Sequence, residues 1–202
     1  MVSDGKRIVG ILLAAGRGER FGGDKLLAKA GAGASADGAQ VAGESIGVAA
    51  CRNLVAALPD VVAVVRPHDS RLAEALAATG ARVVRCESAD DGMGASLACG
   101  VRSTPEAAGW IVALGDMPWI AASTIEQVAR AIGGGAVVAA PFHRGQRGHP
   151  VGFHARCYAE LAALGGDDGA KSVVAAHREA LMRIDVDDPG ALRDVDRPSD
   201  LD

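Results

Sequence analysis

Aromatic side chains are scarce in this sequence of 202 residues, where Phe, Tyr and Trp together make up 3%. The core must therefore be built from Ala, Val, Leu and Ile, a mix that suits buried parallel strands covered by Ala-rich helices. Cysteines are also few, and none of the four lies in a CxxC motif or at metal-ligand spacing from a histidine. This pattern is typical of structural thiols in a reducing compartment, and it argues against zinc and disulfides.

An excess of basic residues is also lacking, since the formal net charge is -4. Nucleic-acid binding would normally need a basic face, so the charge argues against a nucleic-acid partner. No apolar run is long enough to span a bilayer, and the apolar start of the chain has no signal-peptide cleavage pattern. These absences predict a cytoplasmic protein without a membrane partner.

What the sequence does contain is an alternation of apolar strand-like runs and helix-like segments. A composition that is 49% hydrophobic with 27 glycines indicates a globular chain. Alternation of this kind predicts right-handed βαβ units and a mostly parallel sheet. Strands are predicted at residues 7–14, 61–65, 82–85, 110–114 and 136–140, and helices at 44–58, 71–78, 95–102 and 123–132.

The final third of the sequence has a different pattern. Residues 143–153 are rich in turn formers, which predicts a hairpin or a loop lying over the sheet. Two helices, at 158–164 and 169–177, and a closing strand at 182–186 are expected to follow. The Gly/Ala/Ser-rich residues 30–43 predict a mobile surface segment.

The glycine-rich loop from Leu13 to Lys25 is the most informative motif. Glycines directly after a buried strand let backbone N–H groups approach an anion, and Arg20 and Lys25 add positive charge. A Walker A loop is excluded because Leu26 follows Lys25, and a GxGxxG fingerprint is excluded because Phe21 takes the third glycine position. Taken alone, the glycines are also compatible with a plain turn.

The complete pattern, LAAGxGxRxGGxK, resembles the signature loop of nucleotidyltransferases with a GT-A-like fold. Within that branch the chain is most similar to molybdenum cofactor cytidylyltransferases of the MobA-like NTP transferase family, through nearly its whole length. The resemblance implies a three-layer α/β/α Rossmann-like fold with a mostly parallel mixed sheet. It implies one domain over 1–202, with 1–120 mainly for the nucleotide and 121–202 mainly for the acceptor. The nucleotide-binding residues it implies are Leu13, Ala14, Ala15, Gly16, Gly18, Arg20, Lys25, Gly94 and Ser96.

Two acidic segments are the candidates for a metal site. Asp116 follows a predicted central strand, where open α/β sheets place ligands, although a lone Asp there can also be a turn or a helix cap. Asp194 and Asp196 lie in a closing segment that resembles the family's D-x-D-x-P-x-D-L pattern, although alone it is also compatible with a solvated tail. The resemblance implies that Asp116 and Asp196 bind Mg²⁺, which suits carboxylates combined with phosphate oxygens.

Two further segments resemble the acceptor-side motifs of the family, GHPV and GDxGA(R/K). They imply contacts to the acceptor from His149, Pro150, Asp168 and Lys171. A structural histidine in a tight turn is the alternative for His149. Lys171 stands where the family often has Arg, and either cation can meet an anionic acceptor.

The resemblance implies transfer of CMP from CTP to molybdenum-molybdopterin, with Arg20, Lys25 and Asp116 as catalytic residues. CTP is favoured because Ala15 stands where guanylyl-transferring relatives carry glycine, and the added methyl group leaves less room for a purine. The alternatives are guanylyl transfer to the same pterin, nucleotidyl transfer to a sugar or polyol phosphate, and a non-catalytic cofactor chaperone. The expected partners are the nucleotide, the phosphorylated pterin and, transiently, a molybdenum hydroxylase apoenzyme.

Overall fold

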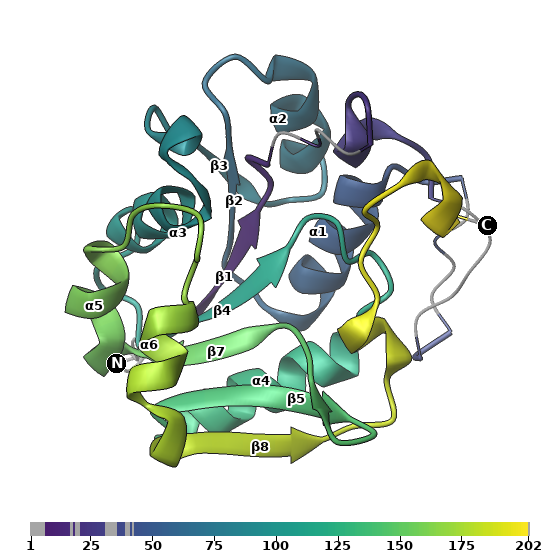
Figure 1. The fold of residues 1–202 in the computed structure, drawn as a ribbon. Coiled ribbons are helices and arrows are strands. Elements are labelled where there is room, and N and C mark those ends of the chain that lie inside the picture. The colour runs from purple at the N-terminus through teal and green to yellow at the C-terminus, as the bar shows by residue number, and fades with distance from the viewer. Residues whose placement is uncertain are drawn as a thin grey trace, which may run out of the picture.

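The computed structural model describes residues 7–16, 18, 21–30, 36–38, 41 and 43–201. Its centre is an eight-stranded sheet with the order β3-β2-β1-β4-β7-β5-β6, in which β8 also pairs with β5 (Figure 1). The strands are β1 (Ile8–Leu13), β2 (Val61–Val65), β3 (Arg82–Arg85), β4 (Gly109–Leu114), β5 (Val138–His143), β6 (Gln146–Arg147), β7 (Val151–His154) and β8 (Leu181–Asp185).

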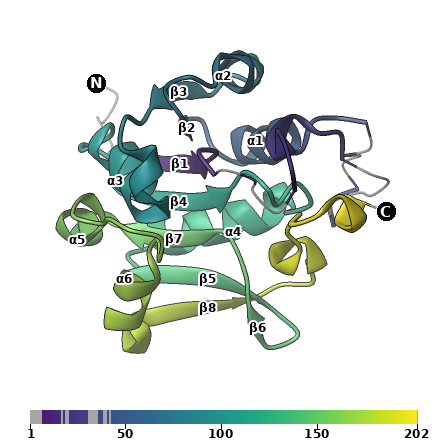
Figure 2. The same ribbon diagram turned by 45° about the horizontal axis from the view of Figure 1, so that its top comes forward.

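Helices cover both faces of this sheet, as Figure 2 shows. One face carries α1 (Ile46–Ala57), α2 (Ser70–Ala77) and α4 (Ala122–Gly133), and the other carries α3 (Met93–Arg102), α5 (Tyr158–Ala162) and α6 (Lys171–Ala176). The strands divide their side chains between two apolar cores, because successive residues of a strand point to opposite faces. Leu12 thus packs with α1, whereas Ile11 packs with α3. The predicted three-layer, mostly parallel mixed fold is confirmed.

The parallel strands β1, β2 and β4 end at the same edge of the sheet, and this edge is where a ligand site is expected. β1 pairs with β2 on one side and with β4 on the other. From β1 the chain continues to β2 and β3 toward one edge of the sheet, and β4 then lies on the opposite side of β1, so the strand order reverses there. In open α/β sheets, ligands bind in the crevice outside the strand ends at such a switch point. Here that crevice lies beyond Leu13 and Leu114.

The prediction for residues 143–153 is wrong in one respect, because β7 lies inside the sheet and not over it. It pairs antiparallel with β4, with Trp110 opposite Phe153, and antiparallel with β5. Both aromatic side chains are fully buried, so the strand fills a central position that short apolar pieces among turn residues did not indicate. Because β7 runs against β4, the residues that precede it, His149 and Pro150, lie near the end of β4.

The chain returns to the end of β4 after β8. The Val195 N–H donates to the Asp116 carbonyl at 2.9 Å, which places the closing acidic segment beside Asp116. The buried carboxylate of Asp188 supports this path, because it accepts from the Ala121 N–H at 2.9 Å and from the Thr124 hydroxyl at 2.7 Å at the start of α4. Over the described ranges, no helix is both long and apolar enough to cross a membrane.

Candidate active site

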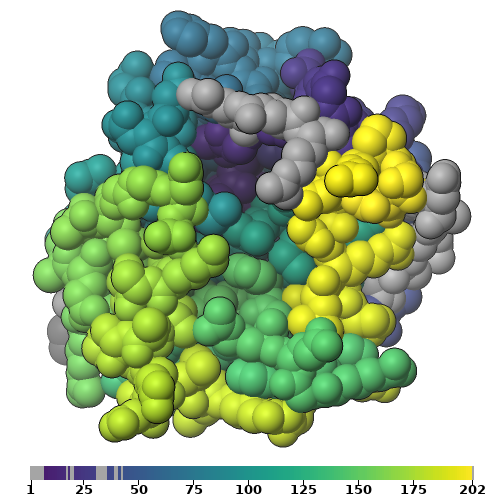
Figure 3. Space-filling model, in the orientation of Figure 1, coloured from purple at the N-terminus to yellow at the C-terminus, as the bar shows by residue number. Residues whose placement is uncertain are grey.

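A cavity of about 490 Å³ opens beyond the carboxyl ends of β1 and β4. In Figure 3 the molecule is hollowed at this place, between the teal and green segments and the yellow C-terminal segment. The walls come from the glycine-rich loop, the start of α3, the end of β4 and the loop before α6. The lining residues are Leu13, Ala15, Gly16, Gly18, Lys25, Leu26, Arg66, Ala89, Asp90, Gly92, Met93, Ser96, Leu114, Asp116 and Asp167.

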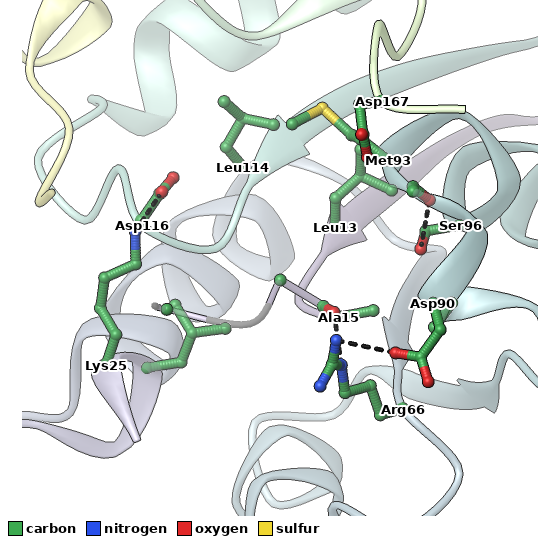
Figure 4. A pocket seen from close by; sticks show the side chains of 15 residues that line it. Leu13, Ala15, Lys25, Arg66, Asp90, Met93, Ser96, Leu114, Asp116 and Asp167 are labelled. Atoms are coloured by element: carbon green, nitrogen blue, oxygen red, sulfur yellow. Dashed lines mark hydrogen bonds and ion pairs between the residues drawn. The ribbon is translucent and has the colours of Figure 1, made fainter. Parts of the chain in front are cut away.

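One end of the cavity is built around Lys25 and Asp116 (Figure 4). Lys25 begins a short 3-10 helix, η1 (Lys25–Leu27), and Asp116 lies two residues beyond β4. The Lys25 Nζ is 2.7 Å from Asp116 Oδ2 and 4.0 Å from Asp196 Oδ1. The lysine and Asp116 side chains are only 14% and 24% exposed, so their charges are partly shielded from water.

Asp200 and Asp194 complete this acidic end. Asp200 Oδ2 accepts from the backbone N–H groups of Asp196, at 2.9 Å, and Arg197, at 2.6 Å, which holds the turn and lowers the pKa of the Asp200 carboxyl. Burial raises the pKa of Asp194, and the carboxylates of Asp116 and Asp196 raise it further, although Lys25 lowers it. Three carboxylates, those of Asp116, Asp194 and Asp196, therefore lie close enough to the Lys25 ammonium to interact with it.

The acidic end fits a divalent cation. Asp116 and Asp196 approach the same ammonium group, so their oxygens already converge on one positive charge. Mg²⁺ is usually held by one or two carboxylates together with waters and substrate phosphates. The donor set is therefore of the right kind for a metal that binds together with a nucleotide.

The other end of the cavity has a different composition. Arg66 follows β2 directly, and its Nε donates to the Ala15 carbonyl at 2.9 Å while a terminal nitrogen donates to Asp90 Oδ1 at 3.1 Å. Ser96 faces the same end from the first turns of α3, where its hydroxyl donates to the Gly92 carbonyl at 3.3 Å. Figure 4 shows Arg66, Asp90 and Ser96 gathered apart from Lys25 and Asp116.

Close backbone contacts hold the start of α3 against the loop before α6. The Gly94 N–H donates to the Gly166 carbonyl at 2.8 Å. Gly92 has a φ of 110°, and a Cβ there would lie 2.4 Å from the Gly166 backbone. Only glycine tolerates both conditions. The contact carries Asp167, on that loop, into the cavity wall.

The structure brings most of the predicted nucleotide residues to this cavity, while their roles stay predictions. The wall includes Leu13, Ala15, Gly16, Gly18, Lys25 and Ser96. Ala14 is instead buried, with its N–H donating to the Val64 carbonyl at 2.9 Å, and Gly94 lies behind the wall in the contact with Gly166. Arg20 lies outside the described residues.

The predicted acceptor residues divide into two groups. His149 is half-buried, and its Nδ1 has no hydrogen-bond partner among the described residues. Burial lowers the pKa of His149 and Arg147 lowers it further, whereas the charge of Asp116 acts in the opposite direction. Pro150 is buried after a cis peptide bond. Asp168 and Lys171 do not line the cavity; both are exposed, with Lys171 Nζ 4.0 Å from Asp168 Oδ1.

Sequence reasoning missed Arg66, Asp90 and Asp167 as cavity residues. A signal existed for Arg66, because it directly follows the apolar run at 61–65 and therefore had to lie at the carboxyl edge of the sheet. Asp90 lies in the short 3-10 helix η2 (Ala89–Asp91) and Asp167 in the loop before α6, and nothing in their local sequence indicates that the two segments meet across the start of α3.

A second group of possible ligands consists of Cys157, directly before α5, Glu160, on α5, and His177, directly after α6. One donor atom from each falls within 4.8 Å of the others, a proximity that sequence spacing did not indicate. The His177 Nε2 is 2.9 Å from Glu160 Oε1, and the Cys157 thiol donates to the Val137 carbonyl at 3.7 Å. Burial, followed by the Glu160 charge, raises the pKa of the Cys157 thiol to about 11. A protonated thiol with a carbonyl partner fits the predicted structural role.

The fold is that of an α/β protein whose ligand cavity lies at the switch point between β1 and β4. The glycine-rich loop forms one part of this cavity, and the carboxylates of Asp116 and Asp196 cluster at one end. The chain belongs to the MobA-like NTP transferase domain family, whose model matches residues 10–181. It is therefore a nucleotidyltransferase of the MobA-like family. No curated protein matches the chain.

Solved structures with this fold extend over almost the whole chain. Rv0371c from Mycobacterium tuberculosis is 27% identical, with a TM-score of 0.79 over 96% of this chain and 95% of its own. Its manganese complex gives 24% identity and a TM-score of 0.73 over 96% of both chains. A nucleotidyl transferase from Methanothermobacter (Mth528) gives 23% identity and 0.78 over 97% and 94%. The molybdopterin-guanine dinucleotide biosynthesis protein A of Archaeoglobus fulgidus gives 19% and 0.64 over 96% and 95%.

Proposed function

We propose that this chain transfers CMP from CTP to the terminal phosphate of molybdenum-molybdopterin, forming molybdopterin cytosine dinucleotide and pyrophosphate. The observation that carries the proposal is the meeting of Lys25 with Asp116 and Asp196 at one end of a nucleotide-sized cavity. Such a cluster suits phosphate chemistry, in which positioning and neutralisation of charge supply most of the catalysis. The predicted cytoplasmic location remains part of this proposal.

Asp116 and Asp196 are the proposed metal ligands. They converge on one cation, and the manganese complex of Rv0371c shows that a related protein takes up a divalent metal. When bound, Mg²⁺ would neutralise charge on the phosphate oxygens of the nucleotide and the acceptor. Once the two carboxylates bind the metal, Lys25 would be able to contact the phosphates of the substrate.

Lys25, Arg20 and the glycine loop are proposed to hold the triphosphate. Backbone N–H groups near Gly16 and Gly18 can approach phosphate oxygens closely because no Cβ stands in the way. Lys25 would stabilise the negative charge that grows on the leaving pyrophosphate, with Arg20 assisting. No general base is needed, since the attacking acceptor phosphate is already anionic at neutral pH.

The acceptor is proposed to enter from the side of His149 and Pro150. Burial keeps His149 neutral, so its ring can donate one hydrogen bond and accept another, and its Nδ1 has no partner among the described residues. The exposed Asp168 and Lys171 could meet the acceptor only at its outer end. Delivery of the product to a molybdenum hydroxylase apoenzyme belongs to the same proposal.

Guanylyl transfer to the same pterin is the leading alternative, and the Archaeoglobus relative carries that guanine dinucleotide function in its name. The methyl group of Ala15, on the cavity wall, favours the smaller cytosine. Transfer to a sugar or polyol phosphate, or a non-catalytic chaperone role, would use the same fold. A chaperone, however, has no need for clustered carboxylates beside a lysine.

The test is pyrophosphate release with Mg²⁺ and molybdenum-molybdopterin, comparing CTP, GTP, ATP and UTP. We expect rapid release with CTP and slow release with the other three nucleotides. Preference for GTP would replace the base assignment by the guanylyl alternative. Release only when the pterin is exchanged for a sugar phosphate would replace the acceptor, and no release under any condition would contradict catalysis.

A further inference from the structure

Arg66 connects two walls of the cavity through one side chain. Its guanidinium donates to the carbonyl of Ala15, in the glycine-rich loop, and to the carboxylate of Asp90, which belongs to the 3-10 helix η2 (Ala89–Asp91). The Arg66 side chain is only 29% exposed, so these contacts are partly shielded from water. The width of the cavity at this end therefore depends on Arg66.

We propose that Arg66, together with Asp90, reads the nucleobase and so determines which nucleotide the enzyme selects. This inference rests on the proposed function, because it assumes that the cavity binds a nucleoside triphosphate. It adds a specificity-determining residue that does not belong to the glycine loop, the metal ligands or the start of α3.

The location of Arg66 favours the base over the triphosphate. Figure 4 shows it beside Ala15 and Asp90 and apart from Lys25 and Asp116, where the phosphates are proposed to lie. Its guanidinium is already paired with the Asp90 carboxylate at 3.1 Å, and a cation held by a carboxylate suits the polar edge of an uncharged ring better than a triphosphate. A nucleotide that binds with its phosphates at Lys25 therefore brings its base to Arg66.

The chemistry of the pair matches the polar edge of a base. A guanidinium has five N–H donors, of which the Nε–H is used on Ala15 and one terminal N–H on Asp90. Others can donate to a ring nitrogen or a carbonyl, while the adjacent carboxylate can accept from an amino group. Cytosine carries an amino donor beside a ring-nitrogen acceptor, whereas uracil has an acceptor beside a donor there. Arg66 and Asp90 together should thus separate CTP from UTP.

The matched variants are Arg66→Gln and Arg85→Gln. Arg85 also donates to a backbone carbonyl, that of Pro67, but it lines no part of this cavity. The readouts are the dissociation constants of the Mg²⁺ complexes of CTP, UTP, GTP and ATP by titration calorimetry, and kcat with the acceptor. For Arg66→Gln we expect about tenfold weaker binding of the preferred nucleotide, since one good base contact contributes about that much discrimination. The preference among the four should shrink, kcat at saturation should change little, and Arg85→Gln should behave as wild type.

A folded Arg66→Gln protein that keeps the wild-type order and size of preference would overturn this inference alone. A wild-type protein that binds none of the four nucleotides would instead overturn the proposed function. Should Arg66→Gln fail to fold, Asp90→Asn takes its place, because the Asp90 side chain is 70% exposed and tolerates exchange. Asp90→Asn should also reduce the preference among the four nucleotides. An unchanged preference in this variant would equally overturn the assignment of Arg66 and Asp90 to the base.

Discussion

The cavity contains two ion pairs of the same kind, Lys25–Asp116 and Arg66–Asp90, with different surroundings. The first is shorter, 2.7 Å against 3.1 Å, and more enclosed, with Asp116 24% exposed against 70% for Asp90. Asp194 and Asp196 add negative charge around the first, whereas Arg66 donates also to the neutral Ala15 carbonyl. Clustered carboxylates suit a metal and its phosphates, whereas a guanidinium already paired with a carboxylate suits the polar edge of a base. We therefore assign chemistry to the first pair and selection to the second.

The largest effect is expected from Lys25→Ala and from Asp116→Ala. Each removes a charge placed where the transition state becomes more negative, and losses of this kind reach about 10²–10³ in kcat. Both side chains are at the cavity wall and outside the apolar cores, so the fold should survive. The measurement is kcat for pyrophosphate release, with circular dichroism to verify folding.

The matched control for this comparison is Lys29→Ala. Lys29 is an exposed lysine four residues further along the chain, and it does not line the cavity. Its removal should leave kcat unchanged. Near-wild-type turnover in Lys25→Ala, or an equal loss in Lys29→Ala, would show that the first ion pair has no special part in the chemistry.

A smaller effect is expected from Asp196→Asn, which keeps the shape of the side chain and removes its charge. Loss of one of two carboxylates weakens a magnesium site that also depends on phosphate oxygens. The Mg²⁺ concentration at half-maximal activity should rise about tenfold, and saturating Mg²⁺ should restore part of kcat. An unchanged Mg²⁺ dependence would remove Asp196 from the metal site.

Gly92→Ala tests the end of the cavity that contains Arg66 and Asp90, without removing any polar side chain. A Cβ at Gly92 would collide with the Gly166 backbone at 2.4 Å, and the φ of 110° is strained for alanine. We expect a loss of about 2 kcal/mol in the free energy of unfolding. Displacement of the loop that carries Asp167 should also raise the KM for the nucleotide more than it lowers kcat. A fall in kcat alone would mean that catalysis and nucleotide selection are not divided between the two ends of the cavity.

The smallest effect is expected from Asp200→Ala. Asp200 is partly exposed, and among the described residues its carboxylate accepts from the backbone N–H groups of Asp196 and Arg197. Loss of such a local cap loosens the turn without removing a ligand. The Mg²⁺ requirement should shift by roughly threefold, in the same direction as in Asp196→Asn. A larger shift than in Asp196→Asn would mean that Asp200, and not Asp196, is the ligand.

Much of the fold could be predicted, because buried parallel strands and amphipathic helices leave strong local patterns. The run at 61–65 became β2 with the predicted bounds, and Ala136–Ala140 became β5 at Val138–His143. β7 escaped prediction because its position depends on pairing with Trp110 and Ile111, far away in sequence. Residues 30–43, predicted to be mobile, are only partly among the described residues, and the division of the chain at residue 120 stays a prediction.

The site could be predicted where a motif carries it, and only there. Lys25 and Asp116, from two separate motifs, lie within 2.7 Å of each other in the structure. Arg66 and Asp90 have no motif, since their meeting depends on β2 ending beside the glycine-rich loop and on the path of η2. Asp168 was predicted at the acceptor, whereas the neighbouring Asp167 is the residue on the cavity wall. The acceptor role of Asp168 stays a prediction, and which side chain of this glycine-flanked loop lines the cavity depends on the loop's contacts with Gly92 and Gly94.

The most direct measurement is a crystal structure of the protein with Mg²⁺ and the α,β-methylene analogue of CTP. We expect the triphosphate at Lys25 with the metal on Asp116 and Asp196, and the cytosine between Ala15, Ser96 and the Arg66–Asp90 pair. A nucleotide bound in the reverse direction, with its phosphates at Arg66, would contradict the assignment of the two ends. A nucleotide bound outside this cavity would contradict the proposed active site as a whole.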